Sequence, residues 1–212
     1  MPAMDTFYVD PFNDAATDDG AGTEAEPWFS LNTGRWTEGC RVVLKSALYI
    51  DGTVTVPVNN VTLEGTSKDE IFIMGTEDDE FAEESAVAPR FFQVFDMTFT
   101  LKNLTLKNMR QETPQGEEQP AYEGMLFLNP GAVLNLENVN IEHVSLPKAR
   151  GGAIFSEGTL NCTNVSFKNC LAAKGAGIYV SQAGRLNCSG CTFKDNSVID
   201  GVSTWRLGAA IC

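Results

Sequence analysis

The chain has 212 residues, of which 43% are hydrophobic and 20% are charged, and its formal net charge is −13. Because binding to a phosphate backbone needs clustered Lys and Arg, this charge disfavours a nucleic-acid partner. The sequence has no run of about 18 apolar residues, which excludes a transmembrane helix, so we expect no membrane insertion.

Residues 1–40 do not fit the repeat that organises the rest of the chain, and we expect them to form an N-terminal cap. Pro27 can open a short helix that runs to Trp36, because proline is favoured at the first helical position. Trp28, Leu31 and Trp36 would then face the first coil. A cap of this kind covers the apolar core and the unpaired strand edge that the end of a repeat array exposes.

The cap contains a segment rich in side-chain oxygen atoms. Carboxylate and amide oxygens are the ligands that Ca²⁺ prefers, although the spacing here does not match an EF-hand loop. Asp and Asn are also the ordinary residues of turns, and this is the simpler interpretation. The candidate calcium ligands are Asp10, Asn13, Asp14, Asp18 and Asp19. We expect no other metal and no cofactor.

An internal repeat runs through residues 41–212. Around each anchor residue, the positions four and two before it and one and three after it are apolar, and the positions between them are mostly polar. Alternation with a period of two is typical of strands with one buried face. The alternation skips a position at the anchor, which predicts a sharp corner with a positive φ angle, a conformation open to Gly and Asn. The anchors form a turn column of Asn60, Asn103, Asn138, Asn164 and Gly190.

A third apolar element recurs between these units. Three short strands per turn predict an all-β fold, a single-stranded right-handed parallel β-helix whose coils stack about 4.8 Å apart. Small residues at the start of the third strand would ease close approach of the backbone. The element reads EGMLF at 123–127, GGAIF at 151–155, GAGIY at 175–179 and GAAIC at 208–212.

Two of the coils are longer than the others. Their extra residues form an acidic segment near 66–90 and a Pro-, Gln- and Glu-rich segment near 110–122, which we expect to be surface loops. The sequence stops at Cys212, in the middle of a repeat strand. We therefore expect the C-terminal end to continue into further coils or to be covered by a partner.

Three aromatic residues share one position of the third strand: Phe127, Phe155 and Tyr179. If the preceding residue of each strand points inward, these rings point outward. A row of exposed rings can stack on sugars or bind a protein. The alternative is that a loop covers the rings.

Three cysteines occupy inward columns, where a free thiol packs as a small hydrophobe. Two of them also form the CxxC pattern Cys188–Cys191, which in other proteins indicates redox or zinc chemistry. A redox motif normally opens a helix, and zinc would need a fourth ligand that the sequence does not offer. A disulfide stays open if the protein is exported, because in-register stacking brings Cys162 and Cys188 within bridging range.

His143 is the only histidine of the chain. It falls in a column with Asn108, Asn169 and Asp195, which we expect at or beyond the end of a strand, and its side chain should be exposed to solvent. A Ser-His-Asp triad would depend on this one residue, and the sequence around it offers no nucleophile.

Two short motifs point to a family. Gly151-Gly152-Ala153-Ile154 matches the GGA(I/L) motif, and Phe193-Lys194-Asp195-Asn196 matches the FxxN motif. Their alternation resembles the polymorphic outer membrane protein repeats and the related adhesin-like surface proteins of bacteria and methanogens. The opening segment, FYVD followed by EPW, is also similar to the start of many secreted right-handed β-helix proteins. This resemblance implies an extracellular or cell-surface location and a role in adhesion or scaffolding.

The sequence thus favours a non-catalytic surface protein whose β-helix presents loops to a glycan or to a host or surface protein. The alternative is a fragment of a carbohydrate-active enzyme, either a polysaccharide lyase or a glycosidase. Such an enzyme needs paired carboxylates or acidic calcium ligands. In residues 124–212 only Glu137 and Glu142 are close in sequence, and a regular strand would put them on opposite faces.

Overall fold

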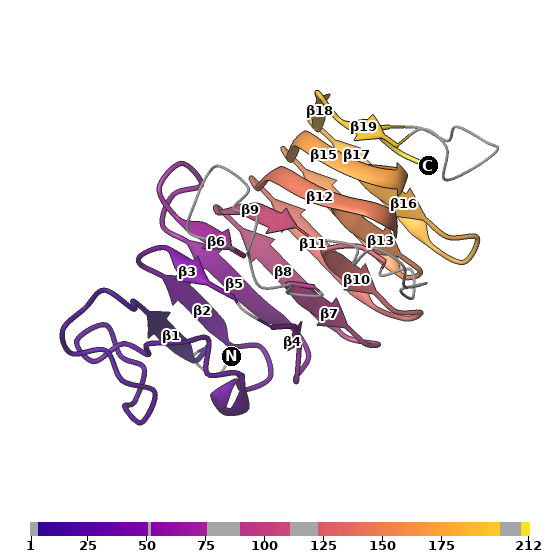
Figure 1. The fold of residues 1–212 in the computed structure, drawn as a ribbon. Helices are drawn as coiled ribbons and strands as arrows, with labels where there is room; N and C mark the ends of the chain where they lie inside the picture. Colours follow the sequence, from indigo (N-terminus) through magenta and orange to yellow (C-terminus); the bar gives the residue numbers. More distant parts are fainter. Residues whose placement is uncertain (1–3, 51, 76–89, 111–122, 200–208) are drawn as a thin grey trace, which may run out of the picture.

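The computed structural model describes residues 4–50, 52–75, 90–110, 123–199 and 209–212. Most of the two predicted surface loops therefore lies outside the described residues. The described chain coils into a stack of rungs whose strands join three sheets in turn, and every strand pair is parallel (Figure 1). The prediction of an all-β parallel β-helix is confirmed. No helix of the described residues is long and apolar enough to cross a membrane.

The first sheet has the order β1-β2-β5-β8-β11-β14-β17. The second sheet has the order β18-β15-β12-β9-β6-β3, with β19 paired to β15, and the third has the order β16-β13-β10-β7-β4. The first-sheet strands are β1 (Thr6–Val9), β2 (Arg41–Leu44), β5 (Val61–Gly65), β8 (Thr98–Lys102), β11 (Val133–Glu137), β14 (Thr159–Thr163) and β17 (Arg185–Ser189). The second-sheet strands are β3 (Leu48–Tyr49), β6 (Phe72–Met74), β9 (Thr105–Arg110), β12 (Asn140–Arg150), β15 (Ser166–Lys174), β18 (Thr192–Lys194) and β19 (Ser197–Val198). The third-sheet strands are β4 (Val54–Thr55), β7 (Phe92–Val94), β10 (Leu126–Leu128), β13 (Ile154–Ser156) and β16 (Ile178–Val180).

The three sheets enclose one continuous apolar core. Strands such as β8 alternate buried and half-buried residues, as the period of two predicts. Parallel register then places equivalent residues directly above one another, for example Leu134 with Leu160 and Leu136 with Cys162. The GGAI-type elements form the third strand as predicted, and Ile211 continues it by a parallel bridge to Ile178.

All five residues of the predicted turn column have the expected positive φ, but Asn60 does not align with the other four. Asn103, Asn138 and Asn164 have φ angles of 50° to 55°, and Gly190 has 65°. Asn60 also has a positive φ, but the register pairs Glu64 with Lys102, so Gly65, the last residue of β5, lies level with Asn103. A Cβ at Gly65 would lie 2.4 Å from the Asn103 carbonyl oxygen, which explains the glycine.

The misassignment has a local cause. The alternating apolar residues Val54, Val56 and Val58 imitate the strand that Val61 and Leu63 form. Two registers therefore fit the sequence pattern of this coil. Stacking of Val61 on Phe99 and of Leu63 on Leu101 selects the second one.

A second column of positive φ angles contains Asn108, His143, Asn169 and Asp195, at 53° to 57°. We expected it at or beyond the strand ends, but its first three members lie inside β9, β12 and β15. The bend at Asn169 separates two backbone groups, the Phe167 carbonyl and the Cys170 amide. The FxxN residue Asn196 of the next coil bonds both, since its amide donates to Phe167 at 3.0 Å and accepts from Cys170 at 2.9 Å.

The cap is extended rather than helical. Residues from Pro27 to Trp36 contain only a 3₁₀ turn, η1 (Thr33–Arg35), so the predicted helix is wrong. Trp28 instead forms a parallel bridge to Val9. Its backbone N–H donates to the Tyr8 carbonyl and its carbonyl accepts from the Asp10 amide, so both groups are hydrogen-bonded without a helix. Strand β1 pairs with β2, so the cap segment adds a strand to the first sheet.

The three apolar residues of the cap are nevertheless buried and belong to the apolar core. Trp28, Leu31 and Trp36 are 1%, 6% and 5% exposed. The Trp36 ring lies 6.3 Å from the Phe99 ring and donates its indole N–H to the Leu31 carbonyl at 2.8 Å.

Candidate functional site

The outer side of the first sheet carries two rows of polar side chains, which we call the polar face. Strand alternation turns these side chains away from the core, and in-register pairing aligns them from coil to coil. The amide row consists of Thr62, Thr100, Asn135, Asn161 and Asn187. The charged row consists of Glu64, Lys102, Glu137, Thr163 and Ser189.

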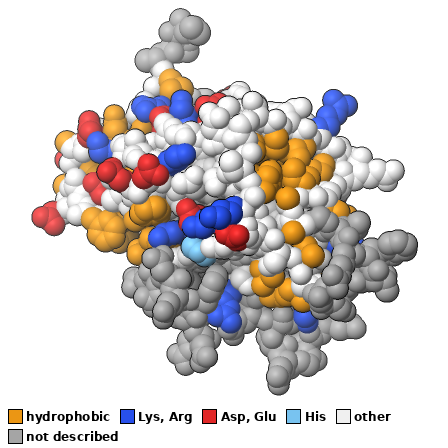
Figure 2. Space-filling model, turned by 90° about the horizontal axis from the view of Figure 1, so that it is seen from above, with side chains coloured by type: hydrophobic (Ala, Val, Ile, Leu, Met, Phe, Trp, Pro, Cys, Tyr) orange, Lys and Arg blue, Asp and Glu red, His pale blue; other side chains and the backbone are white. Residues whose placement is uncertain are grey.

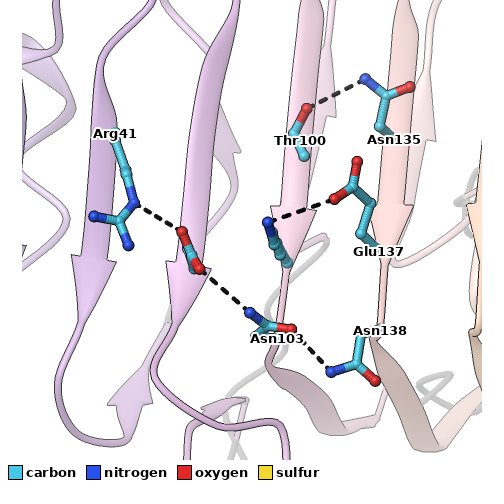
Figure 3. Close-up of polar contacts among 8 residues, drawn as sticks. Arg41, Thr100, Asn103, Asn135, Glu137 and Asn138 are labelled. Atoms are coloured by element: carbon cyan, nitrogen blue, oxygen red, sulfur yellow. Dashed lines mark hydrogen bonds and ion pairs between the residues drawn. The ribbon is translucent and has the colours of Figure 1, made fainter. Parts of the chain in front are cut away.

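Hydrogen bonds connect the amide row along the axis of the β-helix. Asn135 donates to the Thr100 hydroxyl at 3.2 Å (Figure 3), Asn161 donates to Asn135 at 2.9 Å, and Asn187 donates to Asn161 at 2.8 Å. A side-chain amide has two N–H donors and two acceptor lone pairs. Asn135 and Asn161 therefore each keep one donor and one lone pair for a molecule in solvent, and Asn187 keeps one donor and both lone pairs. The row presents these groups in a fixed orientation.

The charged row begins with an anchored glutamate. Glu64 accepts from the Arg41 guanidinium at 2.7 Å and from the Asn103 amide at 3.2 Å, and its side chain is 16% exposed. Asn138 donates to Asn103 at 2.8 Å, so the corner residues continue this network. In Figure 3 these contacts run across neighbouring strands on one side of the sheet.

Glu137 lies on the same face, two strands from Glu64, with Lys102 between them in the same row. The Lys102 ammonium is 3.8 Å from the Glu137 carboxylate, which is half exposed. Two strand spacings separate the backbones of the glutamates by about 10 Å. Sequence reasoning missed this pair because it compared only carboxylates that are close along the chain. Glu137 and Glu142, the two carboxylates that are close in sequence, do not share a face, since Glu142 lies in β12 of the second sheet.

The predicted aromatic row faces away from the core, and its rings are stacked. Their centroids are 5.2 Å and 5.4 Å apart, with interplanar angles of 8° and 6°. However, Phe127 is 8% exposed and Phe155 is 2% exposed, so the expectation of exposed rings is wrong for both. Arg90 lies 4.2 Å above Phe127, and Arg150, ion-paired with Glu123, lies 5.2 Å above Phe155. A binding role for Phe127, Phe155 and Tyr179 stays a prediction, and of the three only Tyr179 is half exposed.

The clustered cysteines are free thiols. Cys162 is buried as the core interpretation predicts, whereas Cys188, its in-register neighbour, is exposed because no described strand pairs with the far side of β17. Burial raises the pKa of Cys162, and the nearby Cys188 and Cys191 thiols raise it further. Burial also raises the pKa of Cys188 to about 11. Both shifts disfavour the thiolate that redox chemistry and zinc binding need.

Three of the five candidate calcium ligands accept hydrogen bonds with their side chains. Asp10 accepts from the Ser46 hydroxyl at 2.5 Å, Asn13 accepts from the Ala15 amide at 2.9 Å, and Asp18 accepts from the Ser30 amide at 2.8 Å. Across the described ranges, no three His, Cys, Asp or Glu side chains converge in a way that could hold a metal ion.

His143 is half-buried rather than solvent-exposed, with 30% of its side chain accessible. Its Nε2 is 2.9 Å from the Asn169 amide of the next coil, and its Nδ1 is 4.0 Å from the Glu142 carboxylate. Beside it, Lys107, Glu142 and Lys168 share one row of the second sheet. Figure 2 shows basic side chains gathered close to the single histidine. His143 thus connects β12 to β15 of the next coil through its contact with Asn169.

No protein-family model matches the sequence, and no curated protein matches it. Among solved structures, the chain is similar to the pectin methylesterase PemA from Erwinia chrysanthemi, with a TM-score of 0.55 and 10% sequence identity. The superposition covers 91% of this chain and 56% of that enzyme, so the chain spans little more than half of its length. At this identity the likeness shows the shared parallel β-helix fold.

Proposed function

We propose that the chain is a non-catalytic glycan-binding β-helix and that the polar face is its binding surface. The amide row is the observation that carries this proposal. Its amides and hydroxyls recur at the coil spacing, about 4.8 Å, which is close to the length of one sugar unit in an extended polysaccharide. A chain of sugars lying along the solenoid axis would meet one hydrogen-bonding position per unit.

The proposal accounts for the orientation of the row. Because Asn161 is bonded on both sides, to Asn135 and to Asn187, its side chain is ordered before a ligand arrives. Groups that are already ordered lose less conformational entropy on binding. Several weak contacts in a line favour long glycans over short ones.

We extend the proposal to an extracellular or cell-surface location and to a role in adhesion or scaffolding. The GGAI and FxxN motifs support this extension, because the surface proteins that they resemble act there. A protein partner on the same face is the alternative ligand.

Glycan-array screening followed by calorimetry with an array-positive oligosaccharide tests the proposal. The double variant Asn135→Ala/Asn161→Ala should weaken binding at least tenfold. The matched control is Asn140→Ala, which removes an amide from the second sheet. The proposal of a glycan site on this face would be contradicted if the protein bound no glycan on the array. It would also be contradicted if the double variant and the control bound with equal affinity.

A carbohydrate-active enzyme is the second candidate, and one observation favours it. Glu64 and Glu137 flank Lys102 on one face of the β-helix, and the fold is shared with a pectin methylesterase. Inverting glycosidases hold their two carboxyl groups about 6.5–9.5 Å apart, a separation that side chains two strands apart can reach.

Turnover separates the two candidates. If the second is correct, a polysaccharide panel should release reducing sugars, unsaturated products or methanol, and Glu137→Gln should abolish this release while leaving glycan affinity intact. Under the first candidate, the wild type binds a glycan from the panel and releases none of these products.

A further inference from the structure

Three of the six cysteines gather at the first sheet, where the chain turns from β17 towards β18. Cys162 of β14 and Cys188 of β17 are in-register partners, so their Cα atoms lie about 4.8 Å apart. Cys191 follows Cys188 after the corner residue Gly190, whose φ is 65°. Residues 159–195, which form these strands and the corner, are all described.

The three thiol groups lie close together. The Cys191 Sγ is 3.6 Å from the Cys162 carbonyl oxygen and 3.7 Å from the Ser189 carbonyl oxygen. It is also within hydrogen-bonding reach of the Cys188 thiol, and both thiols are within reach of the Cys162 thiol. The corner at Gly190 thus turns the side chain of Cys191 back beside that of Cys188.

Solvent reaches two of the three thiols. Cys188 is exposed and Cys191 is half-buried, whereas Cys162 is 2% exposed. A reagent in solution therefore meets the CxxC pair first. A bond between Cys162 and Cys188 is less favoured, since in-register side chains of parallel strands project side by side rather than towards each other.

We propose that Cys188 and Cys191 form a modification site, which a low-molecular-weight disulfide such as oxidised glutathione converts to an intramolecular disulfide while Cys162 stays a thiol. The Cys188 sulfur loses its proton and attacks the glutathione disulfide, so that Cys188 is joined to one glutathione and the other leaves as a thiol. The Cys191 sulfur then attacks the Cys188 Sγ and releases the second glutathione. The two protein thiols lose two electrons and two protons, and one glutathione disulfide gains them as two thiols.

The acidity of the thiols suits a lasting modification rather than redox catalysis. Burial raises the pKa of Cys188 to about 11, and the neighbouring Cys191 thiol raises it further. Little thiolate is present at neutral pH, so the first exchange is slow there and becomes faster as the pH rises. Strongly oxidising CxxC proteins have a stabilised reduced form, and a raised pKa removes that stabilisation, so the disulfide should persist once formed.

The site goes beyond the proposed function, because it neither contacts a glycan nor needs one. Strand alternation places the Cys188 side chain on the opposite side of β17 from Asn187, which belongs to the amide row. Failure of one proposal therefore leaves the other standing.

Peptide mapping tests the proposal. The folded, fully reduced protein is incubated with oxidised glutathione, denatured, alkylated with iodoacetamide and digested with trypsin without reduction. Trypsin places Cys188 and Cys191 in peptide 186–194 and Cys162 in peptide 151–168. Peptide 186–194 should be two hydrogen atoms lighter and unalkylated, and peptide 151–168 should carry one alkyl group. The rate should rise about tenfold per pH unit between pH 7 and 9, in step with the thiolate fraction.

Two comparisons isolate the pair. Cys191→Ser should stop at the mixed disulfide of Cys188 with one glutathione, and the wild type in concentrated urea should also lose the protection of Cys162. Three results would overturn the proposal. They are a crosslink between peptides 151–168 and 186–194, glutathione retained on Cys188 of the wild type, and alkylation of both Cys188 and Cys191 after prolonged incubation at alkaline pH.

Discussion

Asn161 donates its side-chain amide to Asn135 at 2.9 Å, although the two residues are 26 positions apart in the chain. Asn187 repeats the contact one coil further on. The bonds run along the axis of the β-helix, parallel to the main-chain ladders between strands. They fix the direction in which every amide of the row faces solvent.

Replacing Asn161 with Asp places a carboxylate oxygen against the Asn135 oxygen, in the position of a donor. Because the contact turns from attractive to repulsive, Asn161→Asp should lower the free energy of unfolding by about 1–2 kcal/mol in urea titrations at neutral pH. Asn140→Asp introduces the same charge where no such bond is present. Equal losses in the two variants would show that charge, and not the row, is responsible.

The close packing around Gly65, at the end of β5, makes a steric prediction. The added methyl of Gly65→Ala would lie 2.4 Å from the Asn103 carbonyl oxygen and 2.9 Å from the Ile71 Cβ. Overpacking of this kind should cost about 1–3 kcal/mol of unfolding free energy. The control is Gly34→Ala, which meets nothing within 4 Å. An unchanged denaturation midpoint for Gly65→Ala would contradict the register of the first coil.

The FxxN motif makes a prediction about backbone satisfaction. Asn196→Ala removes both the acceptor for the Cys170 amide and the donor to the Phe167 carbonyl. Leaving partly buried backbone groups unpaired should destabilise the protein by about 1–3 kcal/mol. Hydrogen exchange should be faster at the Cys170 amide than in the wild type. Retained protection there would mean that the side chain is dispensable.

The stacked aromatic row predicts that alanine substitutions along the third sheet lower the unfolding free energy by different amounts. Phe155 is 2% exposed between two rings and beneath Arg150, so Phe155→Ala should cost about 3–5 kcal/mol. Tyr179 is half-buried, and its replacement by Ala should cost less. Phe95, which is 43% exposed, is the control, and Phe95→Ala should change the unfolding free energy by under about 0.5 kcal/mol. Similar losses at Phe155 and Phe95 would show that the stack adds nothing to stability.

Burial of Cys170 predicts a loss of stability at alkaline pH. Burial raises the pKa of its thiol to about 12, whereas the unfolded thiol titrates near 8.5. Above pH 8.5 the unfolded chain loses this proton and the folded chain retains it, so the contribution to the unfolding free energy declines with rising pH towards 12.

A valine has no such proton to lose. Cys170→Val keeps an apolar residue of similar size beside Val144, its in-register neighbour. The difference in unfolding free energy between the wild type and this variant, measured by urea titration from pH 7 to 10.5, should therefore move in favour of the variant above pH 8.5. A difference that stays constant across this range would contradict the buried thiol.

The sequence by itself determined the coiled β architecture. Strand alternation around Asn103, Asn138, Asn164 and Gly190 is local information, since it depends only on which side chains face the core and on which residues accept a positive φ. The third strand was equally readable from its repeated GGAI-type pattern. No contact between distant residues was needed to predict these elements.

Only the tertiary structure decided the details that define the sites. The register that places Gly65 level with Asn103 comes from stacking between coils, and Phe155 is buried between two stacked rings with Arg150 5.2 Å above it. Glu64 and Glu137 come to lie on one face, on either side of Lys102, because the parallel register aligns β5, β8 and β11. Strand alternation tells which side of a sheet a residue faces, but the neighbour of that residue depends on how many residues each coil inserts before its strand returns to the same sheet.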